Sequence, residues 1–94
     1  VELHTGRYCD AIGEEKQQAE FALIAAAADE ADGLGLRVCA GHGLGYHNTA
    51  EIATIEAIAE LSIGHAIISR AVFSGLEKAV CDMLAIIRHA NLSF

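Results

Sequence analysis

The amino-acid sequence predicts an α/β fold in which three short parallel strands alternate with helices. Three apolar runs of strand length are each followed by a segment with helical spacing, the pattern of parallel strands joined by right-handed crossovers. Two turns, AGHG at residues 40–43 and IGH at 63–65, place glycine and histidine between strand and helix, and residues 1–6 end in a similar way. Because α/β proteins bind ligands at the carboxyl ends of their strands, these turns predict one shared site.

The first unit is predicted to contain a strand within residues 1–6, a loop at 7–13 and a helix at 14–32. Two glutamates at the start of this helix bring negative charge to the positive end of its dipole. Gly33 is expected to end the helix, because glycine readily takes the left-handed conformation. Four apolar residues at three- and four-residue spacing form the buried stripe: Phe21, Ile24, Ala28 and Ala31.

The second unit is predicted to contain a strand at 36–40, a loop at 41–47 and a helix that runs to about residue 59. Asn48 and Glu51 have the spacing of a capping box at the start of this helix. The residues predicted on its buried face are Ile52, Ile55 and Ala59.

The third unit is predicted to contain a strand at 60–63, a short helix at 66–73 and a last helix that ends near Arg88 and His89. Ser74 and Glu77 have capping-box spacing at the start of the last helix. Five apolar residues are predicted to line one side of it: Leu76, Val80, Met83, Leu84 and Ile87.

An extra short helix that begins with glycine is the phosphate-binding element after the last strands of many (β/α)8, or TIM, barrels. A complete barrel takes about 250 residues, so the 94 residues of this chain match only part of one. The outer strands would then have unpaired edges, which natural sheets avoid. We therefore expect residues 1–94 to form the C-terminal segment of one barrel domain, incomplete or self-associating. Val1, already within a predicted strand, indicates a longer chain.

Composition excludes several classes of partner. The net charge is −7 and the six basic residues are dispersed, so a nucleic-acid partner is not expected. No run of about 18 apolar residues and no secretion signal are present, so no membrane partner is expected. Three cysteines, Cys9, Cys39 and Cys81, form no CxxC pair, which favours reduced thiols in a cytoplasmic protein.

The two glycine-histidine turns supply the candidate site residues. His42 lies between two glycines, which let the backbone approach a ligand, and imidazole exchanges protons near neutral pH, so His42 is the candidate acid-base group. Gly64 and His65 precede a short helix whose first amides have no partner within the helix, which predicts a phosphate site. The alternatives are a histidine in an ordinary tight turn and a purely structural strand-to-helix turn.

Glu2 and His4 lie on the same face of the first strand because side chains alternate with period two. A carboxylate inside a barrel is costly unless it is paired or used, so Glu2 is a candidate for stabilising positive charge during a reaction. The alternative is a solvent-facing Glu2 at a frayed end. Tyr46 replaces the last glycine of a GxGxxG fingerprint, and no HExxH or CxxC motif occurs. Neither a metal nor another cofactor is expected.

Three segments, VELHTGRYCDA, LRVCAGHGLGYHN and ELSIGHAIISRAVFSGLEKAV, occur in the order and spacing of one enzyme family. With them, essentially the whole chain resembles the C-terminal part of pyridoxine 5'-phosphate synthase, the barrel enzyme that closes the pyridine ring in one route to vitamin B6. The resemblance implies a cytoplasmic homo-oligomer that acts on two small phosphorylated substrates, 3-amino-2-oxopropyl phosphate and 1-deoxy-D-xylulose 5-phosphate. The implied products are pyridoxine 5'-phosphate, inorganic phosphate and water.

The resemblance also implies roles for five residues. The family's proton donor corresponds to His42, and its contacts to the amino-ketone phosphate correspond to Gly43, Gly64 and His65. Its acidic transition-state stabiliser corresponds to Glu2, as a cationic imine-like intermediate requires.

One position departs from the family pattern: Cys39 stands where asparagine is usual before Ala-Gly-His. The family's two proton acceptors and its arginine contacts to the other phosphate belong to earlier barrel strands, so the isolated chain is expected to be inactive in the full condensation. The alternative from another class is a non-catalytic phosphate-binding or self-assembling partial-barrel module. A different phosphate-binding barrel enzyme is disfavoured because Glu2, His42 and His65 occur together.

Overall fold

The computed structural model describes the backbone of residues 1–92 and the side chains of residues 1–90. Its strands, β1 (Glu2–His4), β2 (Cys39–Gly41) and β3 (Glu60–Ser62), form one parallel sheet in the order β1-β2-β3. The register sets the first residues of the three strands side by side, and likewise the last residues. The predicted α/β fold with parallel strands is confirmed, and the carboxyl ends of all three strands lie at one edge.

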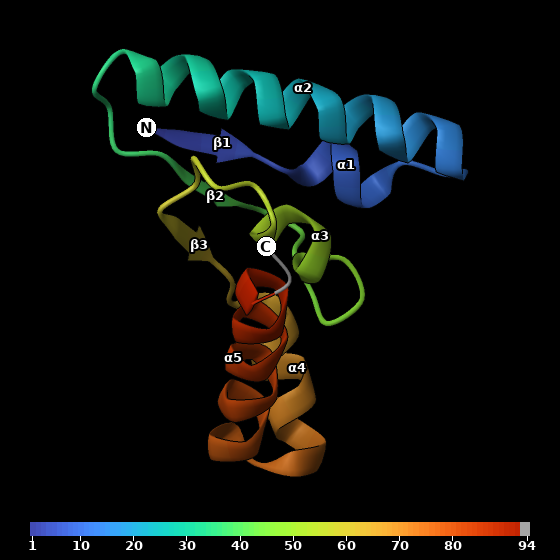
Figure 1. Cartoon of the computed structure of the whole chain (residues 1–94). Helices are drawn as coiled ribbons and strands as arrows, with labels where there is room; N and C mark the ends of the chain where they lie inside the picture. Colours follow the sequence, from blue (N-terminus) through green and yellow to red (C-terminus); the bar gives the residue numbers. More distant parts are fainter. Residues whose placement is uncertain (93–94) are drawn as a thin grey trace.

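Within residues 1–92, five helices accompany the sheet: α1 (Gly6–Asp10), α2 (Glu14–Gly33), α3 (Thr49–Ala53), α4 (His65–Ser74) and α5 (Leu76–Leu92). Figure 1 shows α2 running along the strands, while α4 and α5 form a hairpin that projects away from the sheet beyond β3. The hairpin packs against α3 through α5. In the part of the chain that the structure describes, no helix is both long and apolar enough to cross a membrane.

The two faces of the sheet differ in character. Leu3, Ala40 and Leu61, the middle residues of the strands, contribute to the hydrophobic core. The fully buried core residues come mainly from the helices and loops on that face: Tyr8, Ile24, Ala28, Ala31, Val38, Leu44, Ile52 and Ile55. The flanking residues of the two outer strands, on the opposite face, are polar and exposed: Glu2, His4, Glu60 and Ser62. The sheet is therefore covered on its apolar face and open on its polar one.

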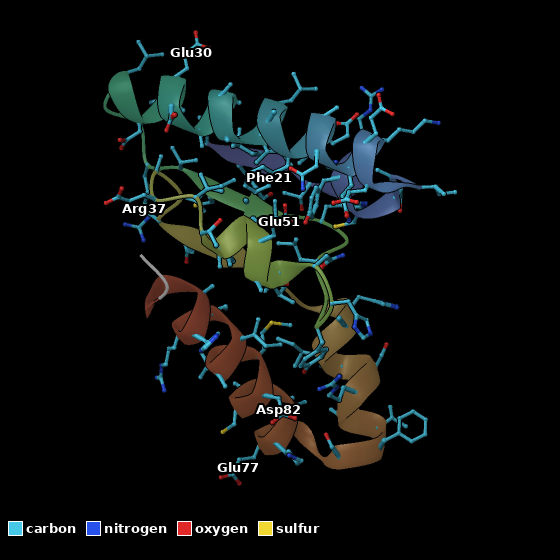
Figure 2. All side chains as sticks on the ribbon, turned by 45° about the vertical axis from the view of Figure 1, so that its right-hand side comes forward. Phe21, Glu30, Arg37, Glu51, Glu77 and Asp82 are labelled. Atoms are coloured by element: carbon cyan, nitrogen blue, oxygen red, sulfur yellow. The ribbon has the colours of Figure 1, made fainter. Side chains whose placement is uncertain are left out.

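The predicted loop at 7–13 is wrong in part, because residues 6–10 form α1. Its Tyr8 is 1% exposed and donates a hydrogen bond of 2.8 Å to the carboxylate of Glu51 in α3. Figure 2 shows Glu51 in the space between α3 and α2, where Gln18 also donates to it at 3.3 Å. Burial of the Tyr8 ring and this long-range bond, rather than local preference, hold the short helix in place.

The helix at 14–32 is confirmed as α2, but Gly33 does not provide the left-handed residue. Gly33 is the last helical residue, and Gly35 has the positive φ of 80°. The amide of Leu36 donates to the carbonyl of Ala31, and the amide of Gly35 to that of Asp32. These two bonds are those of a Schellman motif, which places the left-handed glycine at Gly35.

The helix predicted to reach residue 59 ends at Ala53, and turns lead from there to β3. Ile52 and Ile55 are buried as predicted, whereas Ala59 is exposed. The capping box is wrong as well: the Asn48 side chain accepts a 2.7 Å bond from the amide of Gly45 and makes no cap bond to α3. The polar groups of this segment thus stabilise the loop that precedes α3.

The strands at 36–40 and 60–63 are confirmed with shifted bounds, and the helix at 66–73 is confirmed as α4. The second capping box is wrong, because Ser74 is the last residue of α4 and its hydroxyl donates to the carbonyl of Arg70 at 3.2 Å. Of the predicted apolar side of α5, Met83 is buried and Ile87 is half-buried. Three of its members are exposed: Leu76, Val80 and Leu84.

Candidate active site

A pocket of about 470 Å³ lies at the carboxyl ends of β2 and β3. Its volume falls within the roughly 300–1,000 Å³ typical of small-ligand sites. The loop after β2 and the turn into α4 form its walls, so two units of the fold share it. Its lining consists of His42, Gly43, Leu44, Ser62, Ile63, Gly64, His65 and Ala66. The structure therefore brings together four of the five predicted site residues.

The backbone at His42 is held in an uncommon conformation. Its φ is +89°, in the left-handed region that residues other than glycine rarely adopt, and Gly43 follows with φ +78°. The buried Thr5 hydroxyl shares its proton between the carbonyl oxygens of Gly41 and His42, at 2.8 and 2.7 Å. The amide of Thr5 also donates to Gly41 at 2.8 Å. Because such strain persists only where surrounding contacts enforce it, Thr5, the residue after β1, determines how His42 is presented.

The thiol of Cys9 also contacts this turn, at 3.7 Å from the carbonyl oxygen of His42. Burial raises the pKa of the Cys9 thiol, and the hydrogen bond with Thr5 offsets part of that rise. The thiol is therefore protonated at neutral pH and can donate. Cys9 acts here as a packed hydrogen-bond donor rather than as a nucleophile.

The turn into α4 presents free backbone amides to the pocket. Gly64 is the residue before the helix, and the first helical bond runs from the amide of Ile68 to the Gly64 carbonyl at 3.0 Å. The amides of residues 65–67 therefore precede the hydrogen-bond ladder of the helix. A Cβ added at Gly64 would meet nothing within 4 Å, so the approach to these amides is open. This geometry, with the helix dipole, suits a phosphate group.

Glu2 lies near the pocket but does not line it. Its carboxylate oxygen Oε1 is 2.9 Å from the position that a Cβ on Gly41 would occupy, which places it on the open face of the sheet next to the residue before His42. Its side chain is exposed. The structure thus places Glu2 on the neighbouring strand, on the same face and toward the same edge, and separate from the four pocket residues.

Sequence reasoning placed His4 on this face but gave it no role in the site. In the structure the His4 ring stacks on the His42 ring, with centroids 4.0 Å apart and 27° between the planes. The only signal in the sequence is the two-residue spacing of Glu2 and His4. That spacing shows a shared face, but the partner ring comes from a turn 38 residues further along the chain.

A second set of contacts missed by the sequence joins the loop after β2 to the hairpin. The Arg70 guanidinium lies 3.4 Å above the centre of the Tyr46 ring, and the Tyr46 hydroxyl donates to the carbonyl of Ala79 at 2.6 Å. Arg70 is also 3.6 Å from the carboxylate of Asp82. These contacts therefore connect the loop that contains His42 to α4, the helix with the free amides, and to α5.

Cys39 lies at the opposite end of β2 from His42. Its thiol donates to the Glu60 carboxylate at 3.4 Å, on the open face of the sheet. Within residues 1–92, no group of three or more histidine, cysteine or acidic side chains is placed to hold a metal ion. The chemistry of the site rests on imidazole, carboxylate and backbone amide groups.

Comparison with known proteins identifies the relatives of this chain. The sequence profile of the family described as "Pyridoxal phosphate biosynthesis protein PdxJ" matches residues 1–89. A pyridoxine 5'-phosphate synthase of Photobacterium profundum is 63% identical over 83 residues, which cover 88% of this chain and 34% of that protein. The enzyme of the same name from Thermosynechococcus vestitus is 58% identical over 87 residues, covering 93% of this chain and 37% of the relative. That from Legionella pneumophila is 53% identical over 92 residues, covering 98% and 37%.

Proposed function

The chain belongs to the PdxJ family of pyridoxal phosphate biosynthesis proteins, and on that premise we propose that it carries the amino-ketone phosphate half of the active site of a pyridoxine 5'-phosphate synthase. The complete site condenses 3-amino-2-oxopropyl phosphate with 1-deoxy-D-xylulose 5-phosphate, with no bound cofactor. The products are pyridoxine 5'-phosphate, inorganic phosphate and water. The observation that carries the proposal is that His42 and the first residues of α4 line one pocket.

The proposed roles follow from the chemistry of each group. The amides after Gly64, with Gly43 and His65, hold the phosphate of the amino ketone, since local amides bind an anion even in an acidic protein. His42 is the general acid that protonates a departing oxygen. Glu2 stabilises the positive charge of an imine-like intermediate from the neighbouring strand.

The proposed architecture is the last three βα units of a (β/α)8 barrel, with residues 1–94 as the C-terminal segment of that one domain. The chain spans about a third of the length of the relatives it matches. Within residues 1–92, β1 and β3 pair only with β2, and the open sheet face is polar, as the inside of a barrel around a site requires. We propose that the chain alone is inactive in the full condensation, and that the complete protein is a cytoplasmic homo-oligomer.

The test uses a joined protein, in which this chain replaces the matching 83-residue stretch of the Photobacterium profundum relative. Formation of pyridoxine 5'-phosphate is followed by chromatography and release of phosphate by a colorimetric assay. We expect turnover by the joined protein and none by the 94-residue chain. His42→Asn in the joined protein should lower kcat by about 10²- to 10⁴-fold, the typical contribution of a general acid, with KM nearly unchanged. His47→Asn, an exposed histidine of the same loop outside the pocket, is the matched control.

Two results would count against the proposal. Unchanged kcat in His42→Asn would remove His42 from the mechanism. A joined protein that binds phosphate and assembles in gel filtration, yet never forms pyridoxine 5'-phosphate, would favour the non-catalytic binding or assembly module.

A further inference from the structure

The stacked pair of histidines is the strongest feature of the site that the proposed roles leave unused. His4 ends β1 and His42 follows β2, and their ring centroids are 4.0 Å apart at an interplanar angle of 27°. Both side chains are exposed, so burial does not press the rings together. Stacking of aromatic rings is itself favourable. The contact therefore restricts rotation of the exposed His42 imidazole.

The orientation of His4 is set by the backbone of α1. The amide of Gly6 donates to Nδ1 of His4 at 3.3 Å. Because Nδ1 accepts this bond, the neutral His4 ring carries its proton on Nε2. The ring of His4 is thus directed by the first turn of α1, independently of His42.

Gly6 has no side chain, and this leaves room for the rings of His4 and His42. A Cβ at this position would lie 2.6 Å from Cε1 of His4 and 2.7 Å from Cδ2 of His42, closer than real contacts allow. The φ of Gly6 is not positive, so the backbone itself would accept alanine. The glycine is required here for clearance beside the rings, not for its conformational freedom.

We propose that His4 is a positioning residue, which holds the imidazole of His42 toward the pocket by ring stacking, with Gly6 as the clearance that permits the stack. The inference rests on the proposed role of His42 as general acid. Thr5 fixes the His42 backbone through its carbonyl, while the side-chain torsions are left to the ring contact. Together, His4 at the end of β1, Thr5 after it and Gly6 at the start of α1 determine both the backbone and the side chain of His42.

The test compares two replacements of His4 in the joined protein. His4→Phe keeps a flat ring and loses the Nδ1 acceptor, whereas His4→Leu keeps apolar bulk and loses the ring. We expect His4→Leu to lower kcat by about 10- to 100-fold, the cost of a misplaced reacting group, with KM within about twofold. His4→Phe should recover kcat to within about threefold of the parent. Gly6→Ala should resemble His4→Leu, and Gly33→Ala, where a Cβ meets nothing within 4 Å, should leave kcat unchanged.

A spectroscopic readout tests the stack apart from turnover. The ring protons of His42, observed by NMR in the joined protein, should show a ring-current shift in the parent and in His4→Phe, and lose it in His4→Leu and Gly6→Ala. Parental kcat in a folded His4→Leu, equal losses in the Leu and Phe variants, or a His42 shift unaffected by His4→Leu would each overturn the inference. If His4→Leu fails to fold, Gly6→Ala and His4→Phe still decide it. A joined protein without turnover refutes the proposed function instead, and the ring-proton shifts then decide the positioning role alone.

Discussion

Replacing Ala66 by proline should remove one backbone N–H that donates a hydrogen bond to phosphate, and leave the fold intact. Ala66 is the second residue of α4 and lines the pocket. Its amide precedes the first helical bond, which is made by Ile68, so proline at this position breaks no bond of the helix. The proline ring has no N–H to offer an anion. The substitution therefore separates ligand binding from helix formation.

The expected loss follows from one hydrogen bond to a charged group. Such a bond contributes about 1.5–3 kcal/mol, and each 1.4 kcal/mol corresponds to tenfold in affinity. Ala66→Pro should therefore weaken binding of inorganic phosphate to the chain by about 10- to 150-fold. Screening by solvent at this open pocket favours the lower part of that range.

Isothermal titration of inorganic phosphate into the chain measures the change, and circular dichroism checks helix content. The matched control is Glu77→Pro, because Glu77 is the second residue of α5, begins the neighbouring helix in the same way and lies outside the pocket. Any strain that proline places on the preceding residue is shared by both variants. Equal phosphate affinity in Ala66→Pro and Glu77→Pro would refute the assignment of the α4 amides as the phosphate site.

Other substitutions test how the fold is held. Tyr8→Phe removes a buried hydroxyl that donates to Glu51 and should lower the free energy of unfolding by about 1–2 kcal/mol, measured by urea denaturation; no loss would mean that the bond contributes nothing. Gly35→Ala places a side chain at φ +80° and should destabilise by about 1–2 kcal/mol. Gly33→Ala, within α2, should stabilise by about 0.5 kcal/mol. Changes of the same sign at the two glycines would contradict the observed end of α2.

The periodic features of the sequence predicted the elements that local patterning controls. The apolar stripe through Ile24 and Ala28 predicted α2, and apolar runs of strand length predicted β2 and β3. These predictions succeed because burial of one face makes apolar residues recur at the period of the helix or strand. The errors lie where a tertiary contact outweighs local chemistry. Glu51 has capping-box spacing with Asn48, yet its carboxylate bonds to Tyr8, 43 residues away. The sequence around Tyr8 or Glu51 does not indicate that the two side chains are hydrogen-bonded.

The glycine errors have a related cause. Gly33 and Gly35 are both suitable helix terminators. The left-handed conformation falls on Gly35, two residues after the end of α2, where the amides of Gly35 and Leu36 donate to the carbonyls of Asp32 and Ala31. The shared edge of His42 and Gly64 was easier to predict than the helix ends. His42 and Gly64 each follow a strand, and parallel strands necessarily bring such positions to one edge. Their common pocket followed from topology rather than from residue-by-residue contacts.

Topology alone does not explain how His42 is oriented, and here β1 matters more than its length indicates. A pocket lined by loops after β2 and β3 could exist without β1, since no residue of β1 lines it. Yet the backbone of His42 is bonded to Thr5, and its ring lies on His4. The strained φ of His42 therefore depends on Thr5, the residue that follows a neighbouring strand. This is a physical reason for the sequence His-Thr-Gly between the end of β1 and the start of α1: ring, hydroxyl and clearance act on a single imidazole from His4, Thr5 and Gly6.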